Sequence, residues 1–328
     1  MAICKNSREK IELVVMDDAS SDGTTKLLLT FLPTLLNETS SNFCSNLTGV
    51  KFTRSRISIF ETMCEQQAIY IATAPVIITF QSDMIIRSPG FDSLMINALR
   101  SDSELFLLSA RGVAPTEVLR TAPFIDTYRL LQMVLKRLAN LFFQRRDLVQ
   151  RSNIAPTSPP NSNDLFNLIF PLAEQFVHFG SAGFRGELLQ KWNENLSLEG
   201  FKIPDDKIWI GTFPMRGPCV FFKEKFLEVG GFNTKAFFLG LDDGDICLRA
   251  QIQKGWRSGF YPLNFTSPLR FGTTRKPRSS WQKFLIFVNM LLKSRQVKKS
   301  VLYQVYSKEE DFRIALPEVR TLPIKAVE

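Results

Sequence analysis

Histidine and paired cysteines are scarce in this chain. Its 328 residues include one histidine, His178, which argues against a metal site built on histidines and against a Ser-His-Asp triad. The five cysteines are an odd number and contain no CxxC pair, which argues against a disulfide framework and against a structural zinc site. Any chemistry that this chain performs must therefore rely mostly on carboxylates.

Long apolar runs are missing as well. The first ten residues, MAICKNSREK, contain no apolar segment of the kind found in signal peptides. The longest strongly apolar run, FLIFVNMLL at 284–292, is too short to span a bilayer. With 45% hydrophobic and 22% charged residues, the composition is that of an ordinary globular protein, and 328 residues are long enough for one large or two small α/β domains. We expect a cytoplasmic protein.

Acidic residues are absent from 246–308, a stretch that is rich in lysine and arginine. The net charge of the chain is +9, and this C-terminal part carries the excess. Three interpretations stay open: a solvated surface, a patch that attracts anionic ligands, or a basic amphipathic helix at 279–299 in peripheral contact with an anionic membrane. We expect no nucleic-acid partner, because no recognition motif accompanies the charge.

Strand and helix patterns alternate over the first hundred residues. We expect strands at 12–16, 74–84 and 104–110 and helices at 24–36, 57–72 and 90–100. Such alternation is typical of a mostly parallel sheet flanked by helices. Further along, the patterns predict a strand at 220–222, helices at 127–149, 241–253 and 279–293, and an exposed loop at 153–164.

Acids follow two of the expected strands. In VVMDDASSDGTTKLL (14–28), Asp17 and Asp18 follow the first strand, and in APVIITFQSDM (74–84), Asp83 follows the second. Ligands of open parallel sheets bind beyond the carboxyl ends of the strands. Clustered carboxylates there repel one another unless a cation or hydrogen-bond donors lie among them. The pattern indicates a nucleotide-diphosphate site with a divalent cation.

A structural interpretation of the first segment stays open beside this one. Asp17, Ser20 or Asp22 could cap the helix that follows, and Gly23 could serve a turn. For any one of these residues capping is the simpler explanation, whereas the whole set favours a binding site.

A third group of acids lies in LDDGDICLRA (241–250). Asp242 and Asp243 stand at the start of an expected helix, where negative charge is favourable for the helix dipole. Asp245 and Arg249 are four residues apart and are expected to form an ion pair. A carboxylate in the first turn could alternatively act as a general base that takes the proton of an acceptor hydroxyl.

These three acidic segments, in this order, resemble glycosyltransferase family 2, the inverting sugar transferases with the GT-A fold. VMDDASSDGT resembles the nucleotide-binding segment of the family, and ITFQSDM resembles its DxD region, with Gln81 and Ser82 in the first two places. Residues 216–262 resemble its acceptor-side segment, including a Gly-Gly-Phe turn at 230–232. The usual first strand and helix of the family have no counterpart in residues 1–10.

The resemblance implies a fold and a domain organisation. It implies an α/β GT-A domain, Rossmann-like with a mostly parallel central sheet, over residues 1–265. The donor half would occupy 1–100 and the acceptor half 101–265. A basic, partly helical extension would follow at 266–328. His178, with apolar neighbours on both sides, is expected to be a packed core residue.

The resemblance also implies an activity. The enzyme would move a sugar from a nucleotide-diphosphate sugar to an acceptor hydroxyl of a glycan, a lipid-linked molecule or a protein, with inversion at the anomeric carbon. Residues that would bind the nucleotide sugar are Asp17, Asp18 and Ser20, the first two at its base and ribose. Asp83 would hold Mn²⁺ or Mg²⁺, and Asp243 would be the general base with Asp242 beside it. The alternative is a catalytically degenerate relative that serves as a binding module.

Overall fold

A computed structural model gives the fold of the chain. The residues that it describes are 2–37, 44–82, 84–110, 113–114, 207–211, 213–214, 217–238, 240–261, 263, 265–266, 280–307 and 318–321. The helix expected at 127–149, the loop at 153–164 and His178 lie outside them, as does Asp83.

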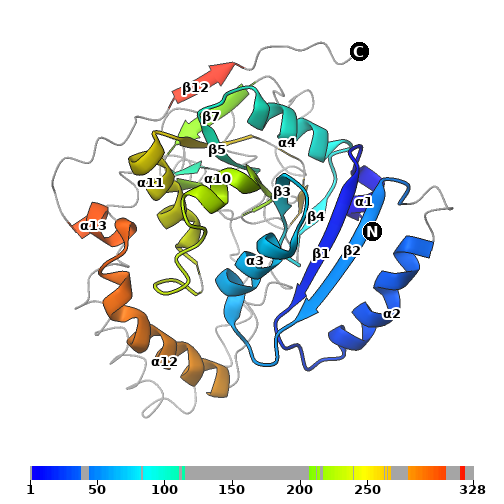
Figure 1. Cartoon of the computed structure of the whole chain (residues 1–328), viewed down its shortest axis with the longest axis horizontal. Helices are drawn as coiled ribbons and strands as arrows, with labels where there is room; N and C mark the ends of the chain where they lie inside the picture. The colour runs from blue at the N-terminus through cyan, green and yellow to red at the C-terminus, as the bar shows by residue number, and fades with distance from the viewer. Residues whose placement is uncertain are drawn as a thin grey trace, which may run out of the picture.

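A six-stranded mixed sheet forms the centre of the molecule (Figure 1). Its strand order is β12 (Glu318–Thr321), β7 (Lys207–Gly211), β10 (Arg257–Phe260), β5 (Leu105–Ser109), β9 (Cys219–Phe222) and β3 (Val76–Thr79). β10 and β5 pair in parallel, and the other adjacent pairs are antiparallel. β12, β10, β5 and β3 nevertheless point the same way, because only β7 and β9 run against them. The fold is therefore α/β as expected, with mixed rather than mostly parallel pairing.

A separate parallel pair, β1 (Ile11–Asp17) and β2 (Leu47–Arg54), lies beside this sheet (Figure 1). β1 confirms the strand expected at 12–16. The sequence pattern missed β2, where Gly49 and Lys51 interrupt the apolar run. Within the described part of the chain, β1 does not pair with β3, although both pack against the same helix, α3 (Phe60–Ile71).

Helices and short strands complete the fold. The remaining helices are α1 (Ala2–Asn6), α2 (Thr24–Asn37), α4 (Phe91–Arg100), α10 (Lys223–Glu228), α11 (Asp242–Lys254), α12 (Ser280–Val297) and α13 (Val301–Ser307). Two short antiparallel pairs are β4 (Ile85–Ile86) with β11 (Phe265–Thr266) and β6 (Val113–Ala114) with β8 (Phe213–Pro214). The helices expected at 24–36, 57–72, 90–100, 241–253 and 279–293 are confirmed as α2, α3, α4, α11 and α12. None of the helices described here has the length and apolar character needed to cross a bilayer.

The core fills both faces of the six-stranded sheet. All five residues of β5 are buried. On one face, Leu105 and Leu108 pack with Met95 and Leu99 of α4. On the other, Phe106 joins a cluster to which α3, α10 and α11 contribute. The sheet is thus the base on which α3, α4, α10 and α11 pack.

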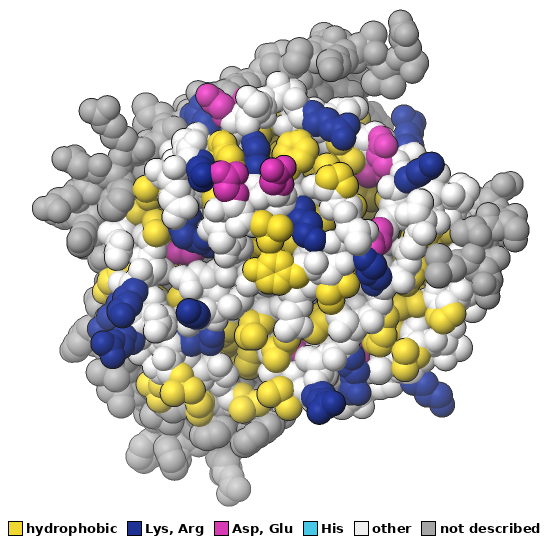
Figure 2. Space-filling model, viewed as in Figure 1, with side chains coloured by type: hydrophobic (Ala, Val, Ile, Leu, Met, Phe, Trp, Pro, Cys, Tyr) yellow, Lys and Arg dark blue, Asp and Glu magenta, His cyan; other side chains and the backbone are white. Residues whose placement is uncertain are grey.

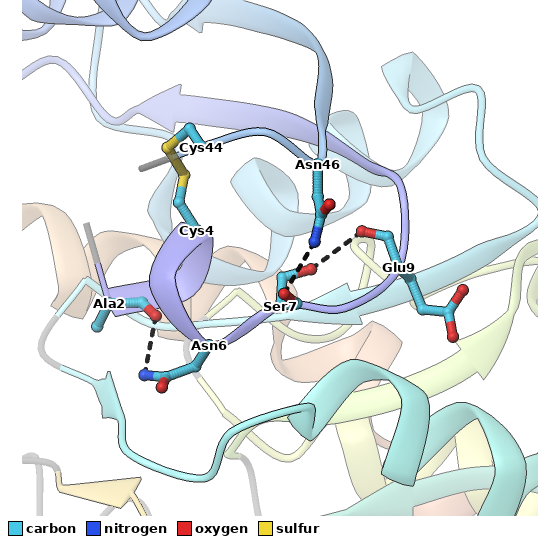
Figure 3. The surroundings of a disulfide bond; sticks show 7 residues. All are labelled: Ala2, Cys4, Asn6, Ser7, Glu9, Cys44 and Asn46. Atoms are coloured by element: carbon cyan, nitrogen blue, oxygen red, sulfur yellow. Dashed lines mark hydrogen bonds between the residues drawn. A yellow bond between two sulfur atoms is a disulfide. The ribbon is translucent and has the colours of Figure 1, made fainter. Parts of the chain in front are cut away.

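The N-terminal segment is fastened by a disulfide, Cys4–Cys44 (Figure 3). The sequence argued against a disulfide framework, but this one disulfide was not foreseen, because two cysteines 40 residues apart leave no local signature. Hydrogen bonds add to this attachment. The Asn46 amide donates to the Ser7 carbonyl at 2.9 Å, and the buried Asp92 carboxylate of α4 accepts the Glu9 N–H at 2.9 Å.

Candidate functional site

Asp17 ends β1 and is buried, with 4% of its surface exposed. Its carboxylate accepts the Ser20 N–H at 3.1 Å and the Thr25 hydroxyl, and it pairs with Arg54 Nε at 3.4 Å. Burial by itself would raise the pKa of Asp17. The hydrogen bonds from Ser20 and Thr25 and the charge of Arg54 outweigh burial, so this pKa is lowered. Asp17 is therefore an ionised carboxylate that holds the loop after β1 against the end of β2.

Asp18 caps the N-terminal end of α3, the helix that follows β2. Its Oδ1 accepts the Ser55 hydroxyl at 3.1 Å and the Ile59 N–H at 2.7 Å. Its Oδ2 accepts the Ser58 hydroxyl at 2.7 Å and the Phe60 N–H at 3.1 Å. An ionised carboxylate offers about four lone-pair positions. All of them are used here, so Asp18 has no acceptor position left for a ligand in this geometry.

The capping interpretation of the first segment is confirmed for Asp22. Its Oδ1 accepts the Thr24 N–H at 3.2 Å and the Thr24 hydroxyl at 2.6 Å, at the first residue of α2. The carbonyl of Ser20 accepts a hydrogen bond from Arg54 at 3.1 Å. The contact of Asp17, Asp18 and Ser20 with a nucleotide stays a prediction. In this geometry the Asp17 side chain is only 1% exposed, and both aspartates are held by internal contacts.

The first turn of α3 joins all three predicted segments. Phe60 donates its N–H to Asp18 after β1, and Glu61 accepts a hydrogen bond from Gln81 after β3. Thr62 donates its N–H to the Phe238 carbonyl at 3.4 Å, just before α11. Three consecutive residues thus contact the three segments that the sequence selected independently.

Backbone strain is found at the same places. Among the described residues, positive φ occurs at three that are not glycine, namely Ala19 (54°), Phe60 (65°) and Leu241 (67°). Ala19 follows Asp18, Phe60 donates to Asp18, and Leu241 precedes the acids of α11. Positive φ is costly for residues with a side chain and persists where the surroundings enforce it, which is frequent at functional sites. The strain thus marks these three turns as candidates for a common site.

Asp242 and Asp243 begin α11 but differ in accessibility. Asp242 is fully buried, whereas Asp243 is half-buried and accepts the Gly244 N–H at 2.9 Å. Burial raises the pKa of the neighbouring Cys219 thiol to about 12, and the negative charges of Glu65 and Asp243 contribute to the shift. Asp243 is therefore the acid of this pair that is placed to meet a ligand, and it shares its surroundings with Glu65 of α3.

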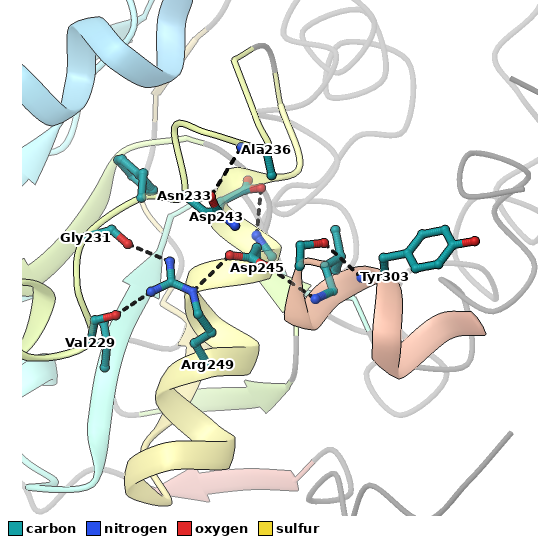
Figure 4. Close-up of polar contacts among 12 residues, drawn as sticks. Val229, Gly231, Asn233, Ala236, Asp243, Asp245, Arg249 and Tyr303 are labelled. Carbon is teal, nitrogen blue, oxygen red and sulfur yellow. Dashed lines mark hydrogen bonds and ion pairs between the residues drawn. The ribbon is translucent and has the colours of Figure 1, made fainter. Parts of the chain in front are cut away.

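The ion pair expected between Asp245 and Arg249 is confirmed, with 2.9 Å between Oδ2 and Nε (Figure 4). Asp245 is fully buried and also accepts the Leu302 N–H of α13 at 3.2 Å. Arg249 donates further hydrogen bonds to the carbonyls of Val229 and, at 2.5 Å, Gly231. This pair thus clamps the Gly-Gly-Phe turn and α13 onto α11, which is a structural role.

Sequence reasoning missed the polar face of α3. Glu61 and Glu65 are one helical turn apart, and Gln66 accepts the Phe232 N–H of the Gly-Gly-Phe turn at 2.6 Å. Their i,i+4 spacing was a signal, but the apolar periodicity of the same stretch drew attention to its buried face. Asp18, Asp17 and Glu61 also raise the pKa of the Cys64 thiol, in addition to the larger effect of its burial. Asp17, Asp18 and Glu61 thus lie close enough to Cys64 to act on its thiol.

A metal site cannot be assembled from the described residues alone. Within them, no group of three or more His, Cys, Asp or Glu side chains is arranged to hold a metal ion. The predicted ligand, Asp83, lies outside the described residues, two positions after Gln81. Metal binding by Asp83 therefore stays a prediction.

Comparison with known proteins gives only weak likenesses. No family model matches the chain, and no curated protein matches it. GalNAc-T7, solved with UDP, GalNAc and Mn²⁺, is 11% identical with a TM-score of 0.41, over 78% of this chain and 37% of that one. Mannosyltransferase PcManGT from Pyrobaculum calidifontis, in complex with GDP-Man and Mn²⁺, is 13% identical with a TM-score of 0.41, over 90% and 59%.

A third solved structure, S. aureus TarS 1-349 in complex with UDP-GlcNAc, is 11% identical with a TM-score of 0.42. The match covers 93% of this chain and 66% of TarS. The chain thus spans less than two thirds of the length of each of these proteins. At these TM-scores the likeness carries no weight for function, which has to be inferred from the chain's own residues.

Proposed function

We propose that this chain is a GT-A-type glycosyltransferase that moves a sugar from a nucleotide-diphosphate sugar to an acceptor hydroxyl with inversion. The supporting observation is the first turn of α3, where Phe60, Glu61 and Thr62 contact the donor segment, the DxD-like segment and the acceptor-side segment. A transferase needs its donor and acceptor groups side by side. The fold joins segments that lie more than 200 residues apart in the sequence around one helical turn.

Asp243 is the proposed general base. It begins α11 and is half-buried, so it could accept the proton of an acceptor hydroxyl as the hydroxyl oxygen attacks the sugar. Asp242 is fully buried beneath it and would position the turn rather than touch the acceptor. The described residues contain no histidine, so the candidates for this base among them are carboxylates.

On the donor side, we assign Ser20 to the nucleotide, and Asp17 and Asp18 to holding the donor loop against the end of β2 and against α3. Asp83 would hold Mn²⁺ or Mg²⁺, which would supply positive charge to the departing diphosphate. The acceptor would be a glycan, a lipid-linked molecule or a protein. Peripheral membrane contact through α12 agrees with the exposure of Leu291 and Leu292 at 52% and 74%.

One observation favours the alternative of a non-catalytic binding module. The carboxylate of Asp18 accepts four hydrogen bonds from residues 55–60, at and before the start of α3. This part of the donor motif therefore has a structural role. A module of this kind would keep its fold and could bind a glycan or protein, but it would not turn over a nucleotide sugar.

Nucleoside-diphosphate release separates the two proposals. The full chain is incubated with a panel of UDP- and GDP-sugars and Mn²⁺, with and without glycan acceptors, and free diphosphate is measured. The transferase proposal predicts release from at least one donor, and a loss of about 10²–10⁴-fold for Asp243→Asn. Glu228→Gln, in an exposed ion pair of α10, is the control and should retain full release. Absence of release with every donor supports the binding module.

A further inference from the structure

β1 and β3 run along the same helix without pairing with each other. At one end, the Glu12 carboxylate of β1 accepts the Thr73 N–H at 2.7 Å, just before β3 begins at Val76. At the other end, Asp18 after β1 and Gln81 after β3 both bond the first turn of α3. The two strands therefore lie alongside α3 in the same direction, each with one edge that the described residues leave unpaired.

The backbone groups on the open edge of β1 can be assigned from its bonds to β2. The Asp17 carbonyl accepts the Ser55 N–H at 3.0 Å, and the Ile11 N–H bonds the Asn46 carbonyl at 2.9 Å. Both contacts are on the β2 side, and backbone groups point alternately to the two sides of a strand. Every second residue from Ile11 to Asp17 therefore faces β2. The residues whose N–H and C=O groups face away from β2 are Glu12, Val14 and Met16.

The open edge of β3 follows from its bonds to β9. The Pro75 carbonyl accepts the N–H of Lys223, which directly follows β9, at 2.9 Å. Ile77 and Thr79 follow Pro75 at every second position, so they bond β9 as well. The residues whose N–H and C=O groups face away from β9 are Val76 and Ile78. Among the described residues, none of these outward backbone groups of β1 or β3 has a hydrogen-bond partner.

The two open edges face each other. β3 is the last strand of its sheet, and β1 lies between β3 and β2 (Figure 1). Val14 of β1 and Ile77 of β3 reach the same apolar cluster, which includes Ile69 of α3. On its other face, β1 packs in a cluster with α2, and β3 packs in a cluster with α4. A segment placed between the strands would therefore meet apolar groups on both of its faces.

Neither strand carries the residues that usually blunt an open edge. Natural edge strands are often protected by lysine or proline, because an open edge recruits other strands. β1 (IELVVMD) and β3 (VIIT) contain neither. The outward residues that are apolar and half-buried are Val14, Met16, Val76 and Ile78. Figure 2 shows apolar side chains at the surface across the face that carries α3 and the β1–β2 pair.

A single extended segment can satisfy both edges at once, since its own N–H and C=O groups point alternately to its two neighbours. Strand addition takes its affinity from such backbone bonds and its specificity from alternate side chains. A strand that already belongs to a sheet could not enter between β1 and β3, which argues against a second copy of this chain. We propose that an extended, unpaired segment of a partner polypeptide docks between β1 and β3, parallel to both. Because both of its faces meet apolar clusters, this segment is rich in valine and isoleucine.

The proposal does not depend on glycosyl transfer, and a labelled peptide tests it on the full chain. The probe is the fluorescent peptide KVIVVIVK, and its binding is measured by fluorescence anisotropy. Two control peptides have the same sequence but carry N-methyl groups on alternate amides, on the odd positions in one and on the even positions in the other. Each control keeps its side chains and loses its bonds to one edge. The unmodified peptide should bind, and each control should bind about tenfold more weakly or worse.

Hydrogen exchange locates the bound peptide. In the free chain, the outward amides should exchange faster than those of Leu13 and Val15, which bond β2. The peptide should slow exchange on both strands about tenfold or more. The amides expected to respond are those of Glu12, Val14, Met16, Val76 and Ile78.

Two variants of the chain complement the peptides. Met16→Pro removes an outward N–H and places a ring on the open edge, which a strand tolerates where that N–H has no partner strand. It should abolish binding without unfolding the chain. Leu227→Ser alters an exposed leucine of α10 and should bind the peptide as the unaltered chain does. If Met16→Pro does not fold, the N-methylated peptides decide the question on the unaltered chain.

Four results would overturn the proposal. The first is no binding of the unmodified peptide, and the second is equal binding of the N-methylated peptides, which would show apolar adhesion without strand pairing. The third is slowed exchange on one strand alone, or outward amides that are already slow in the free chain. The fourth is a dimer in analytical ultracentrifugation that the peptide dissociates, which would assign the open edges to a second copy.

Discussion

The β1–β2 pair and the six-stranded sheet are stabilised by different means. Every residue of β5 is buried, whereas β1 is only half-buried up to Asp17. The β1–β2 pair relies instead on a disulfide, on the α1 attachments and on carboxylates that accept several hydrogen bonds. Where fewer apolar side chains are buried, hydrogen-bonded carboxylates connect the segments instead.

The two acid pairs reflect this difference. Asp18, next to the thin core, is saturated by donors from the turn before α3. Asp243 lies at the start of α11, next to the core of the six-stranded sheet. The Asp245–Arg249 ion pair already holds this helix in place, and Asp243 itself is half-buried. At the start of α11 the structural contacts are made by Asp245 and Arg249, and Asp243 stays the proposed general base.

The largest effect on stability is expected for Asp245→Ala. It leaves the Arg249 guanidinium partly buried without its carboxylate and removes the acceptor of the Leu302 N–H, so the free energy of unfolding should fall by about 3–5 kcal/mol. Urea unfolding measures it. Glu228→Ala, which breaks an exposed ion pair, should cost less than about 1 kcal/mol. Equal losses of stability in the two variants would show that the buried Asp245–Arg249 pair contributes no more than the exposed pair.

Loss of the disulfide should be next in size. Reduction, or Cys4→Ser with Cys44→Ser, should destabilise the β1–β2 pair by about 2–4 kcal/mol, since the bond closes a loop of 40 residues. Hydrogen exchange should rise in residues 2–54 and stay unchanged in β5. The double variant should be insensitive to reductant. A free thiol count of five in the oxidised protein would show that the bond does not form.

The same bond bears on the compartment of the protein. A reducing cytoplasm keeps most protein thiols reduced, so the Cys4–Cys44 bond would persist only in an oxidising compartment, and the cytoplasmic location expected from the sequence stays a prediction. A chain that needs the bond for stability should be recovered folded only from an oxidising compartment or after oxidative refolding.

A smaller effect is expected for Asp18→Ala. The substitution leaves two backbone N–H groups and two hydroxyls without their acceptor, which should cost about 1–3 kcal/mol. Asp22→Ala, in the same segment but exposed, loses a helix cap and should cost about 0.5–1 kcal/mol. Chemical denaturation compares them. A cost for Asp18→Ala no larger than that for Asp22→Ala would contradict the structural assignment of Asp18.

The smallest effect on stability is expected for Asp17→Asn, and it should depend on pH. The pKa of Asp17 is below its ordinary value of 3.8 in the folded state, so its ionised form stabilises the fold above that pH. As the pH falls below 3.8 toward the folded pKa, the contribution is lost. The difference in unfolding free energy between the unaltered chain and Asp17→Asn should therefore be constant near neutral pH and shrink in acid. A difference that grows in acid would contradict the shift.

Much of the fold could be predicted from periodicity, because α2, α3, α4, α11, β1, β5 and β9 have clear apolar patterns. β2 and β10 could not be predicted in this way. Gly49 and Lys51 interrupt the apolar pattern of β2, and Arg257, Ser258 and Gly259 weaken that of β10. The pairing of strands that lie far apart in the chain could not be predicted from the sequence either. The insertion of β9 between β5 and β3 decides the mixed character of the sheet, and no local pattern encodes it.

The candidate site was partly predictable for a related reason. Acids at strand ends are visible in the sequence, and so is the Asp245–Arg249 pair. Their partners are not, because the donors that saturate Asp18 come from residues 55–60, about forty positions away. Nor could the sequence show that Glu61 and Thr62 join the other two segments, which depends on how α3 packs.

Binding of nucleotide diphosphates tests the central claim most directly, since it needs no knowledge of the acceptor. The full chain and Asp83→Ala are titrated calorimetrically with UDP and with GDP, in Mn²⁺ and in EDTA. A donor site predicts binding of one nucleotide that requires Mn²⁺ and is lost in the variant. A folded chain that binds neither nucleotide, or that binds equally well in EDTA, would contradict it.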